Sequence, residues 1–231
     1  MPHRAANRLL GSPTDAELRR WRRAAEPVRL KRGQALEMRG GPSGHVWFPD
    51  SATVSILYAM ADGASGEIAL IGAEGLVGRS LPPGLGTARH RAVVSGAGDG
   101  HRVPAALVVE EIGREGPFAR ALARFTETLV AQVSQLVACN RHHRLEQQLC
   151  RLLLSSLDLS GNRRLETTHE WLATRLGVRR EGVTAALGAL RDAGTVEARR
   201  GRVEVLDRAA LEAASCECQA AIVAERERLL G

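Results

Sequence analysis

The side chains best suited to contacting nucleic acid are gathered in one stretch near residue 180. Arg179, Arg180, Glu181 and Thr184 lie there, and Arg191 ends the same stretch. On a helix these residues share the face that carries no packing side chain, and the two arginines stand at its N-terminus. A planar guanidinium matches phosphate oxygens and base edges. The pattern predicts a helix that meets the major groove of DNA, with a solvated charged face as the alternative.

The apolar residues around this stretch have the spacing of a helix-turn-helix motif. Gly177 can adopt the left-handed conformation that a sharp turn between two helices requires. Val178 is expected to fill the angle between these helices. The residues expected to pack the two helices together are Leu172, Ala173, Leu176, Val183, Leu187 and Leu190. This spacing is typical of the motif, although it also occurs by chance in helical proteins.

A basic hairpin is predicted directly after the second helix. Residues 196–207 contain two short β-like stretches that meet at Arg200-Gly201, with Arg199 and Arg202 beside the turn. Such a hairpin makes the motif a winged helix. We expect Arg200 and Arg202 to contact phosphate and to carry no sequence information.

A long helix is predicted over residues 117–143, with Pro117 acceptable in its first turn. Its apolar residues recur at steps of 4, 3, 4, 4 and 3, and an asparagine follows after a further 4. Such a seam is typical of two paired helices, whose register a single polar residue can determine. A helix packed only on its own domain is the alternative. The predicted dimer seam consists of Phe118, Leu122, Phe125, Leu129, Val133, Leu136 and Asn140.

The segment before the long helix is rich in β-strand signals. From about residue 27 to 110, short Val, Ile and Leu runs are interrupted by turn residues at intervals of about 8–12 residues. This predicts an antiparallel sandwich or barrel with a hairpin turn at Asp62-Gly63, preceded by a helix over residues 14–25. The expected fold is α+β: a jelly-roll-like antiparallel β-roll over 1–116, a dimerisation helix over 117–143 and a winged helix-turn-helix domain over 144–231.

Composition narrows the class of protein. The 231 residues are 44% hydrophobic, which is enough for a buried core, but only 3% aromatic. No apolar run approaches the roughly 18 residues that span a bilayer, and the arginine-rich N-terminal segment has no apolar stretch typical of a secretory signal. The net charge is +6, and Lys31 is the only lysine. This excess of basic over acidic side chains favours a polyanionic partner, although a GC-rich genome also produces abundant arginine.

The sequence resembles the Crp/Fnr-type bacterial transcription regulators over nearly its whole length. The resemblance is most specific in residues 168–207 and in the segment GEIALIGAEGLVG, and it is loose in residues 1–30. It implies a cytoplasmic homodimer without enzymatic activity that binds a palindromic operator on double-stranded DNA. It also implies a β-roll that responds to a signal, and contact with RNA polymerase.

The resemblance also implies individual roles. Arg180 matches the arginine that contacts guanine in this family. Glu181 matches the glutamate that contacts cytosine. Thr168 and His169 match the positions at which family members bind a DNA phosphate. One departure is Ala185, where the members that respond to cyclic AMP carry a further basic residue, so part of the half-site recognition differs.

The region that binds cyclic nucleotides in some family members is altered. Glu74-Gly75-Leu76 is followed by an enlarged loop over residues 81–94, and Arg91-Ala92 lacks the hydroxyl residue that helps to cradle the cyclic phosphate. Arg89-His90 matches no better. We therefore expect no tight binding of cyclic AMP or cyclic GMP. The effector stays unknown, and no cofactor is expected.

The cysteines are too few for a disulfide scaffold in a chain of this length. Cys139 and Cys150 have apolar neighbours and are expected to be small core residues. Cys216-Glu217-Cys218 leaves metal binding and oxidation sensing open, but a lone C-x-C is more often incidental, and no metal ligand is assigned. The adjacent His142 and His143 point apart on a helix, and no N-terminal cysteine cluster for an iron–sulfur centre is present.

Two other classes of function stay open. His45, His90 and His101 in the β-rich segment raise the hypothesis of a metal-dependent jelly-roll enzyme, although the chain has no H-x-H pair. A β-roll adaptor that binds protein rather than DNA is the other. Salt-dependent binding to duplex DNA separates a regulator from both.

Overall fold

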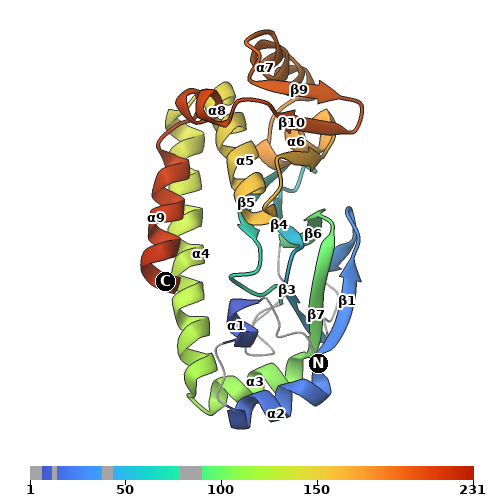
Figure 1. The fold of residues 1–231 in the computed structure, drawn as a ribbon, viewed down its shortest axis with the longest axis vertical. Coiled ribbons are helices and arrows are strands. Elements are labelled where there is room, and N and C mark those ends of the chain that lie inside the picture. The colour runs from blue at the N-terminus through green and yellow to red at the C-terminus, as the bar shows by residue number, and fades with distance from the viewer. Residues whose placement is uncertain (1–6, 12–14, 38–43, 79–89) are drawn as a thin grey trace.

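The computed structural model describes residues 7–11, 15–37, 44–78 and 90–231. Figure 1 shows a β-rich N-terminal domain, one long helix along a side of the molecule, and a C-terminal domain of helices with a small sheet. The predicted order of a β-roll, a long helix and a winged helix-turn-helix is confirmed. Within the described residues, no helix is long and apolar enough to cross a membrane.

Two antiparallel sheets form the N-terminal domain. Their strands are β1 (Glu26–Leu30), β2 (Ala35–Glu37), β3 (His45–Pro49), β4 (Thr53–Ala59), β5 (Ser65–Ile71), β6 (His90–Gly96) and β7 (Gly98–Pro104). One sheet has the order β1-β7-β3 and the other β2-β6-β4-β5. The hairpin predicted at Asp62-Gly63 joins β4 to β5, and Gly63 there has a φ of 89°. The antiparallel β-roll is therefore confirmed.

Four helices accompany the β-roll: α1 (Arg8–Gly11), α2 (Asp15–Ala24), α3 (Ala105–Gly113) and the long α4 (Pro117–His142). Three aromatic rings pack helices α2 and α4 against strand β3. The ring of Trp21 on α2 lies 4.8 Å from that of Phe118 on α4 and 5.7 Å from that of Phe48 on β3. Trp21 is 2% exposed and the two phenylalanines 0%. Burial of each ring stabilises the fold by about 1.5–3 kcal/mol, so these three rings hold α2 and α4 against β3.

One face of α4 is buried within the protomer. Phe118 and Phe125 pack in the core of the β domain, and Leu136 is only 4% exposed. The predicted dimer seam includes these three residues, but the protomer itself covers them, so a partner chain cannot reach them. Leu122, Leu129 and Val133 are half-buried and Asn140 is exposed, which leaves these four accessible in part or in full.

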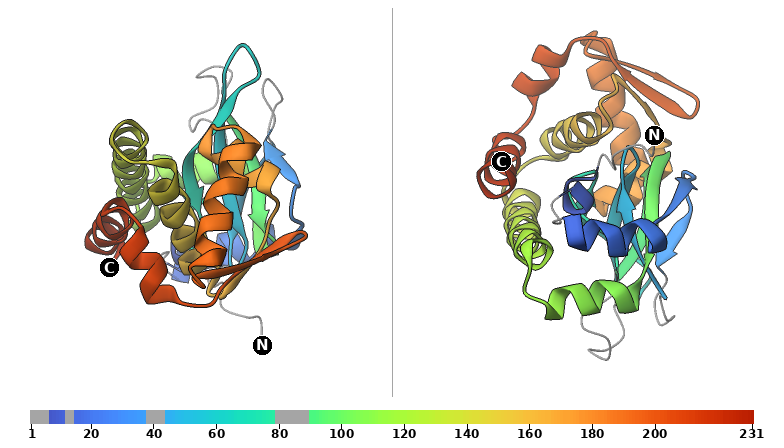
Figure 2. Two further views of the ribbon diagram at one scale, coloured as in Figure 1. Left: turned by 90° about the horizontal axis from the view of Figure 1, so that it is seen from above. Right: turned by 60° about the horizontal axis from the view of Figure 1, so that its bottom comes forward.

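The last helix, α9 (Cys218–Leu230), returns beside the second half of α4 (Figures 1 and 2). The C-terminal segment therefore does not stay with the DNA-binding motif from which it emerges. It packs instead on the helix that the sequence analysis predicted for dimerisation. This contact accounts for part of the buried face of α4.

The C-terminal domain is built from helices α5 (Leu145–Ser160), α6 (His169–Leu176), α7 (Arg180–Asp192) and α8 (Arg208–Ala214), and strands β8 (Arg164–Glu166), β9 (Val196–Arg199) and β10 (Arg202–Val205). Leucines of α5, α6 and α7 share one core. The sheet has the order β8-β10-β9, and its β9–β10 hairpin turns at Arg200-Gly201 as predicted. The short strand β8 is not predicted from the sequence.

A buried ion pair joins the two domains. Nε of Arg175 on α6 donates to Oε2 of Glu67 on β5 at 2.6 Å, and a second nitrogen donates to Oε1 at 3.1 Å. The two side chains are only 3% and 5% exposed. The same guanidinium donates to Oγ of Ser156 on α5 at 3.1 Å. This two-pronged geometry satisfies both charges and holds α6 against the end of the β4–β5 hairpin.

Removal of the cation from this pair is expected to destabilise the protein strongly. Arg175→Ala leaves the Glu67 carboxylate buried without a partner, which costs about 3–5 kcal/mol of unfolding free energy. Chemical denaturation followed by circular dichroism measures the change. The control is Arg191→Ala, because the Arg191–Asp192 pair has side chains that are 61% and 71% exposed, and loss of an exposed pair has little effect. Equal effects of the two changes would contradict a buried pair that joins the domains.

Candidate DNA-binding interface

Helix α6 begins at a side-chain cap and ends at a glycine. The backbone N–H of Trp171 donates to Oγ1 of Thr168 at 3.0 Å, which satisfies one of the free groups of the first turn. Gly177 ends the helix with a φ of 69°, and its N–H donates to the carbonyl of Ala173. The sharp turn predicted at this glycine is therefore confirmed.

Val178 does not fill the angle between α6 and α7. Its side chain is 36% exposed. The reason is that Leu172, Val183 and Leu187, each at most 1% exposed, already occupy the space between the helices.

Helix α7 exposes the polar face that the sequence predicts. Val183, Ala186, Leu187 and Leu190 are buried on one side. Arg180, Glu181 and Thr184 are exposed on the other. No described side chain caps the start of the helix, where Arg179 is the N-cap residue. The free N–H groups of this first turn carry partial positive charge, which favours an anion such as phosphate.

A groove of about 530 Å³ lies between the start of α6, helix α7 and the β9–β10 hairpin. It brings together five of the eight residues predicted to contact DNA: Thr168, His169, Arg180, Thr184 and Arg200. Nδ1 of His169 and Oγ1 of Thr184 are 2.9 Å apart, so a hydrogen bond connects α6 to α7 across this groove.

The other three predicted residues lie outside the groove lining. Arg179 and Glu181 are exposed at the N-terminus of α7, beside the groove. Arg202 is half-buried on the middle strand of the sheet, opposite Arg199 on one side and Glu166 on the other. The exposed tip of the wing is therefore Arg200, which is better placed than Arg202 to reach a phosphate.

Two further arginines of the groove were expected from the sequence on the polar face of the helix and beside the wing turn, but neither was assigned a DNA contact of its own. Arg191 and Arg199 both line the groove. Each also forms an ion pair with a carboxylate close in sequence, Asp192 and Glu197 respectively. Arg180 and Arg200 form no ion pair with a described residue. Within the groove lining, these two guanidinium groups are thus the ones whose charge is available to a polyanion.

Comparison with known families matches residues 144–214 to a model described as the Crp-like helix-turn-helix domain. The chain carries a Crp-like helix-turn-helix domain. The matched residues run from the start of α5 to the end of α8 and include the whole groove. The predicted helix-turn-helix and its wing are thereby confirmed.

Solved structures of Crp/Fnr-type regulators resemble the whole chain, not only the Crp-like domain. A Crp/Fnr-family regulator from Eubacterium rectale has a TM-score of 0.69 at 18% identity, covering 92% of this chain and 97% of its own. FixK2 from Bradyrhizobium japonicum has a TM-score of 0.69 at 15% identity, covering 83% and 98%. A regulator from Thermus thermophilus has a TM-score of 0.65 at 20% identity, covering 82% and 98%. No curated protein matches the sequence. The chain therefore has the fold of the Crp/Fnr regulators, and the resemblance predicted from sequence is confirmed.

The β-roll that precedes the Crp-like domain carries an apolar groove of about 490 Å³ between α4 and the sheet of β4 and β5. Ile56, Leu122 and Leu129 line it, and His90 is the ionisable side chain in its described lining. Arg91 is exposed on β6. Arg89 and most of the enlarged loop lie outside the described residues, so the expectation about cyclic nucleotides stays a prediction.

The cap of α6 allows a direct test of how Thr168 contributes. Thr168→Ala removes the acceptor of the Trp171 N–H and is expected to cost about 1 kcal/mol of unfolding free energy. Thr168→Ser keeps the hydroxyl and retains most of this stability. Denaturant titration of both variants measures the difference. If serine were as destabilising as alanine, the hydroxyl would not be the cap.

Proposed function

We propose that this chain is a homodimeric, cytoplasmic transcription regulator that binds a palindromic DNA operator through helix α7 of each protomer. The observation that carries the proposal is the groove between α7 and the wing. There, Arg180 and Arg200 are both exposed and form no ion pair with a described residue. Two available guanidinium groups, one on a helix and one on a hairpin, suit base edges and phosphate respectively.

The two groups of side chains have different tasks in this proposal. Arg180 forms a bidentate pair with O6 and N7 of a guanine, and Glu181 accepts from the amino group of a cytosine. Thr168, His169 and Arg200 hold phosphates and so determine the register of the protein on the duplex. The hydrogen bond between His169 on α6 and Thr184 on α7 helps to hold the phosphate-binding residues in position relative to the base-contacting residues.

An exposed stripe on α4 supports a dimer with an amended seam. Thr126, Val130, Val133, Val137 and Asn140 follow one another at steps of 4, 3, 4 and 3. Val130 is 57% exposed and Val137 is 67% exposed. Apolar side chains repeated at this period pack well against the same stripe of a second helix. Two-fold symmetry then separates the two α7 helices by roughly 34 Å, one turn of DNA.

Response to a signal and contact with RNA polymerase are the parts of the proposal that rest on the resemblance. The groove between α4 and the sheet is where a small effector has room. Its described lining offers no arginine to a phosphate, which supports weak binding of cyclic nucleotides and favours an apolar effector.

The alternative of a metal-dependent jelly-roll enzyme gains no support. His45, His90 and His101 lie on three different strands, and among the described residues they do not gather into a set of three ligands. Nδ1 of His101 lies 2.9 Å from Oδ2 of Asp50, which gives this histidine a structural partner. The β-roll adaptor stays open, and DNA binding decides against it.

The role of α7 is tested by comparing Arg180→Ala with Arg200→Ala. Arg180→Ala is expected to weaken the selected operator about ten- to a hundred-fold and to relax the preference at one base pair. Arg200→Ala is expected to weaken every duplex nearly equally and to lower the salt slope by about one. Fluorescence anisotropy with the operator, single-base variants and random duplex over a range of salt measures both.

Arg164→Ala serves as the matched control, because Arg164 is an exposed arginine of the same domain outside the groove lining. It is expected to change neither specificity nor affinity by more than about two-fold. An unchanged operator preference in Arg180→Ala would show that α7 is not the recognition helix.

The amended seam is tested by Val137→Glu on α4. A charge in an apolar helix pair is expected to convert the dimer to monomer at micromolar concentration, because the carboxylate loses its hydration in the seam. The control is Ala138→Glu, which adds the same charge at the next exposed residue, about 100° round the helix. Sedimentation velocity measures the oligomer. A wild-type monomer, or dissociation by Ala138→Glu alone, would contradict this seam.

A further inference from the structure

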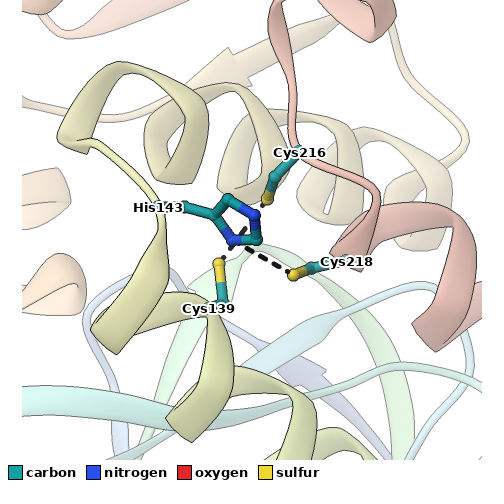
Figure 3. A group of neighbouring side chains, drawn as sticks. All are labelled: Cys139, His143, Cys216 and Cys218. Atoms are coloured by element: carbon teal, nitrogen blue, oxygen red, sulfur yellow. Dashed lines mark hydrogen bonds between the residues drawn. The ribbon is translucent and has the colours of Figure 1, made fainter.

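Three cysteines and a histidine from distant parts of the chain come together at the end of α4. Cys139 lies in the last turn of α4, and His143 follows directly after the helix. Cys218 is the first residue of α9, and Cys216 lies two residues before it. Figure 3 shows the imidazole of His143 among the three sulfur atoms. The four potential ligand atoms all lie within 4.8 Å of one another.

The distances within the cluster suit a single metal ion. Sγ of Cys139 and Sγ of Cys216 are 3.6 Å apart, and Sγ of Cys218 is 3.5 Å from Nδ1 of His143. Four ligands at about 2.0–2.3 Å around a tetrahedral zinc ion stand about 3.3–3.8 Å from each other. The atoms are therefore nearly at the spacing that the ion requires. A polynuclear iron–sulfur cluster would need its ligands farther apart, because several atoms separate them.

The histidine is oriented as a ligand. Nε2 of His143 lies 3.2 Å from Oε2 of Glu217, so a hydrogen bond to the carboxylate places the proton on Nε2 and leaves the lone pair of Nδ1 facing the thiols. Metal-binding histidines commonly have such a carboxylate on their other nitrogen. Gln135 also donates from Nε2 to Sγ of Cys218 at 3.1 Å, an interaction that stabilises a thiolate.

A buried arginine beside the cluster has no counter-charge among the described residues. Arg151 is 5% exposed, forms no ion pair with a described residue, and its Nε has no hydrogen-bond partner among them. The positive charge of Arg151 acts on the Cys139 thiol. A zinc ion with three thiolates and one neutral imidazole carries a net charge of −1. Such a centre would balance the buried guanidinium.

We propose that Cys139, His143, Cys216 and Cys218 bind one zinc ion in a closed, tetrahedral structural site. Binding exchanges the three thiol protons for the ion and changes no oxidation state. The site fastens the start of α9 to the end of α4. Because His143 and the next residue are the only ones between α4 and α5, the ion also holds the junction from which the DNA-binding domain departs.

The sequence alone predicts no metal ligand here, because each half of this set is unremarkable by itself. Cys139 and His143 are one helical turn apart, and Cys216 and Cys218 form a lone C-x-C. His142, the neighbour of His143, is exposed and takes no part. Only the return of α9 along α4 brings the two halves together.

The test uses the full-length protein purified under reducing conditions. Elemental analysis is expected to find about one zinc ion per chain. Replacement by Co²⁺ is expected to give the intense visible bands of a tetrahedral centre, together with a thiolate-to-cobalt charge-transfer band. Absence of bound zinc after incubation with Zn²⁺, or the weak spectrum of an octahedral centre, would overturn the proposal.

Paired variants show whether these four residues are the ligands. His143→Ala and Cys216→Ser are expected to lower zinc affinity at least ten-fold in a competition titration with a chelating dye. His142→Ala and Cys150→Ser are the matched controls, since Cys150 is a buried cysteine outside the four-residue set. Equal losses in the controls would overturn the assignment, as would a Cys139–Cys216 disulfide in the protein isolated without oxidant.

A separate measurement tests whether the zinc ion fastens α9 to α4. Removal of zinc with a chelator is expected to increase amide hydrogen exchange in residues 218–230, because α9 is then held only by its side-chain packing. Unchanged exchange in α9 would contradict a role in fastening this helix.

Discussion

The buried ion pair between Arg175 and Glu67 holds the two domains in one arrangement. Charges removed from water are costly unless they are paired, so α6 separates from β5 only when both side chains regain solvent. Ser156 accepts a hydrogen bond from the same guanidinium, which includes α5 in the contact. Because α7 packs on α5 and α6, this one interaction orients the DNA-binding groove relative to the β-roll.

Helix α4 also connects the β-roll to the DNA-binding domain. Its first half shares the core of the β-roll, its second half carries α9, and it also bears an exposed apolar stripe. The apolar groove borders the same helix, so a molecule bound there contacts α4 directly. At its far end lie the junction to α5 and the proposed zinc site. The ion pair and the metal would thus restrain the DNA-binding domain at two separate places.

Much of the fold follows from local patterns that a single sequence contains. The helix-turn-helix needs only a few apolar residues at helical spacing and a residue able to adopt positive φ at Gly177. The wing turn at Gly201 and the hairpin at Gly63 depend on the same backbone property. The exposed face of α7 is equally local, because its residues are within four turns of one another. Val178 does not follow its local pattern: it was expected to pack between the two helices, but it is exposed because other side chains fill that space.

The sequence by itself thus determined most of the element types, their order and the polar face of α7, whereas strand β8 and helix α3 were not predicted. The tertiary structure decided which partner each apolar face meets. The period of α4 is the same whether Phe118 and Phe125 face a second chain or the β-roll, so the pattern cannot distinguish the two. The meeting of Cys139 with Cys216, and of Glu67 with Arg175, likewise depends on how distant elements pack. Such contacts carry no local signal, because their energy arises only when the chain has folded.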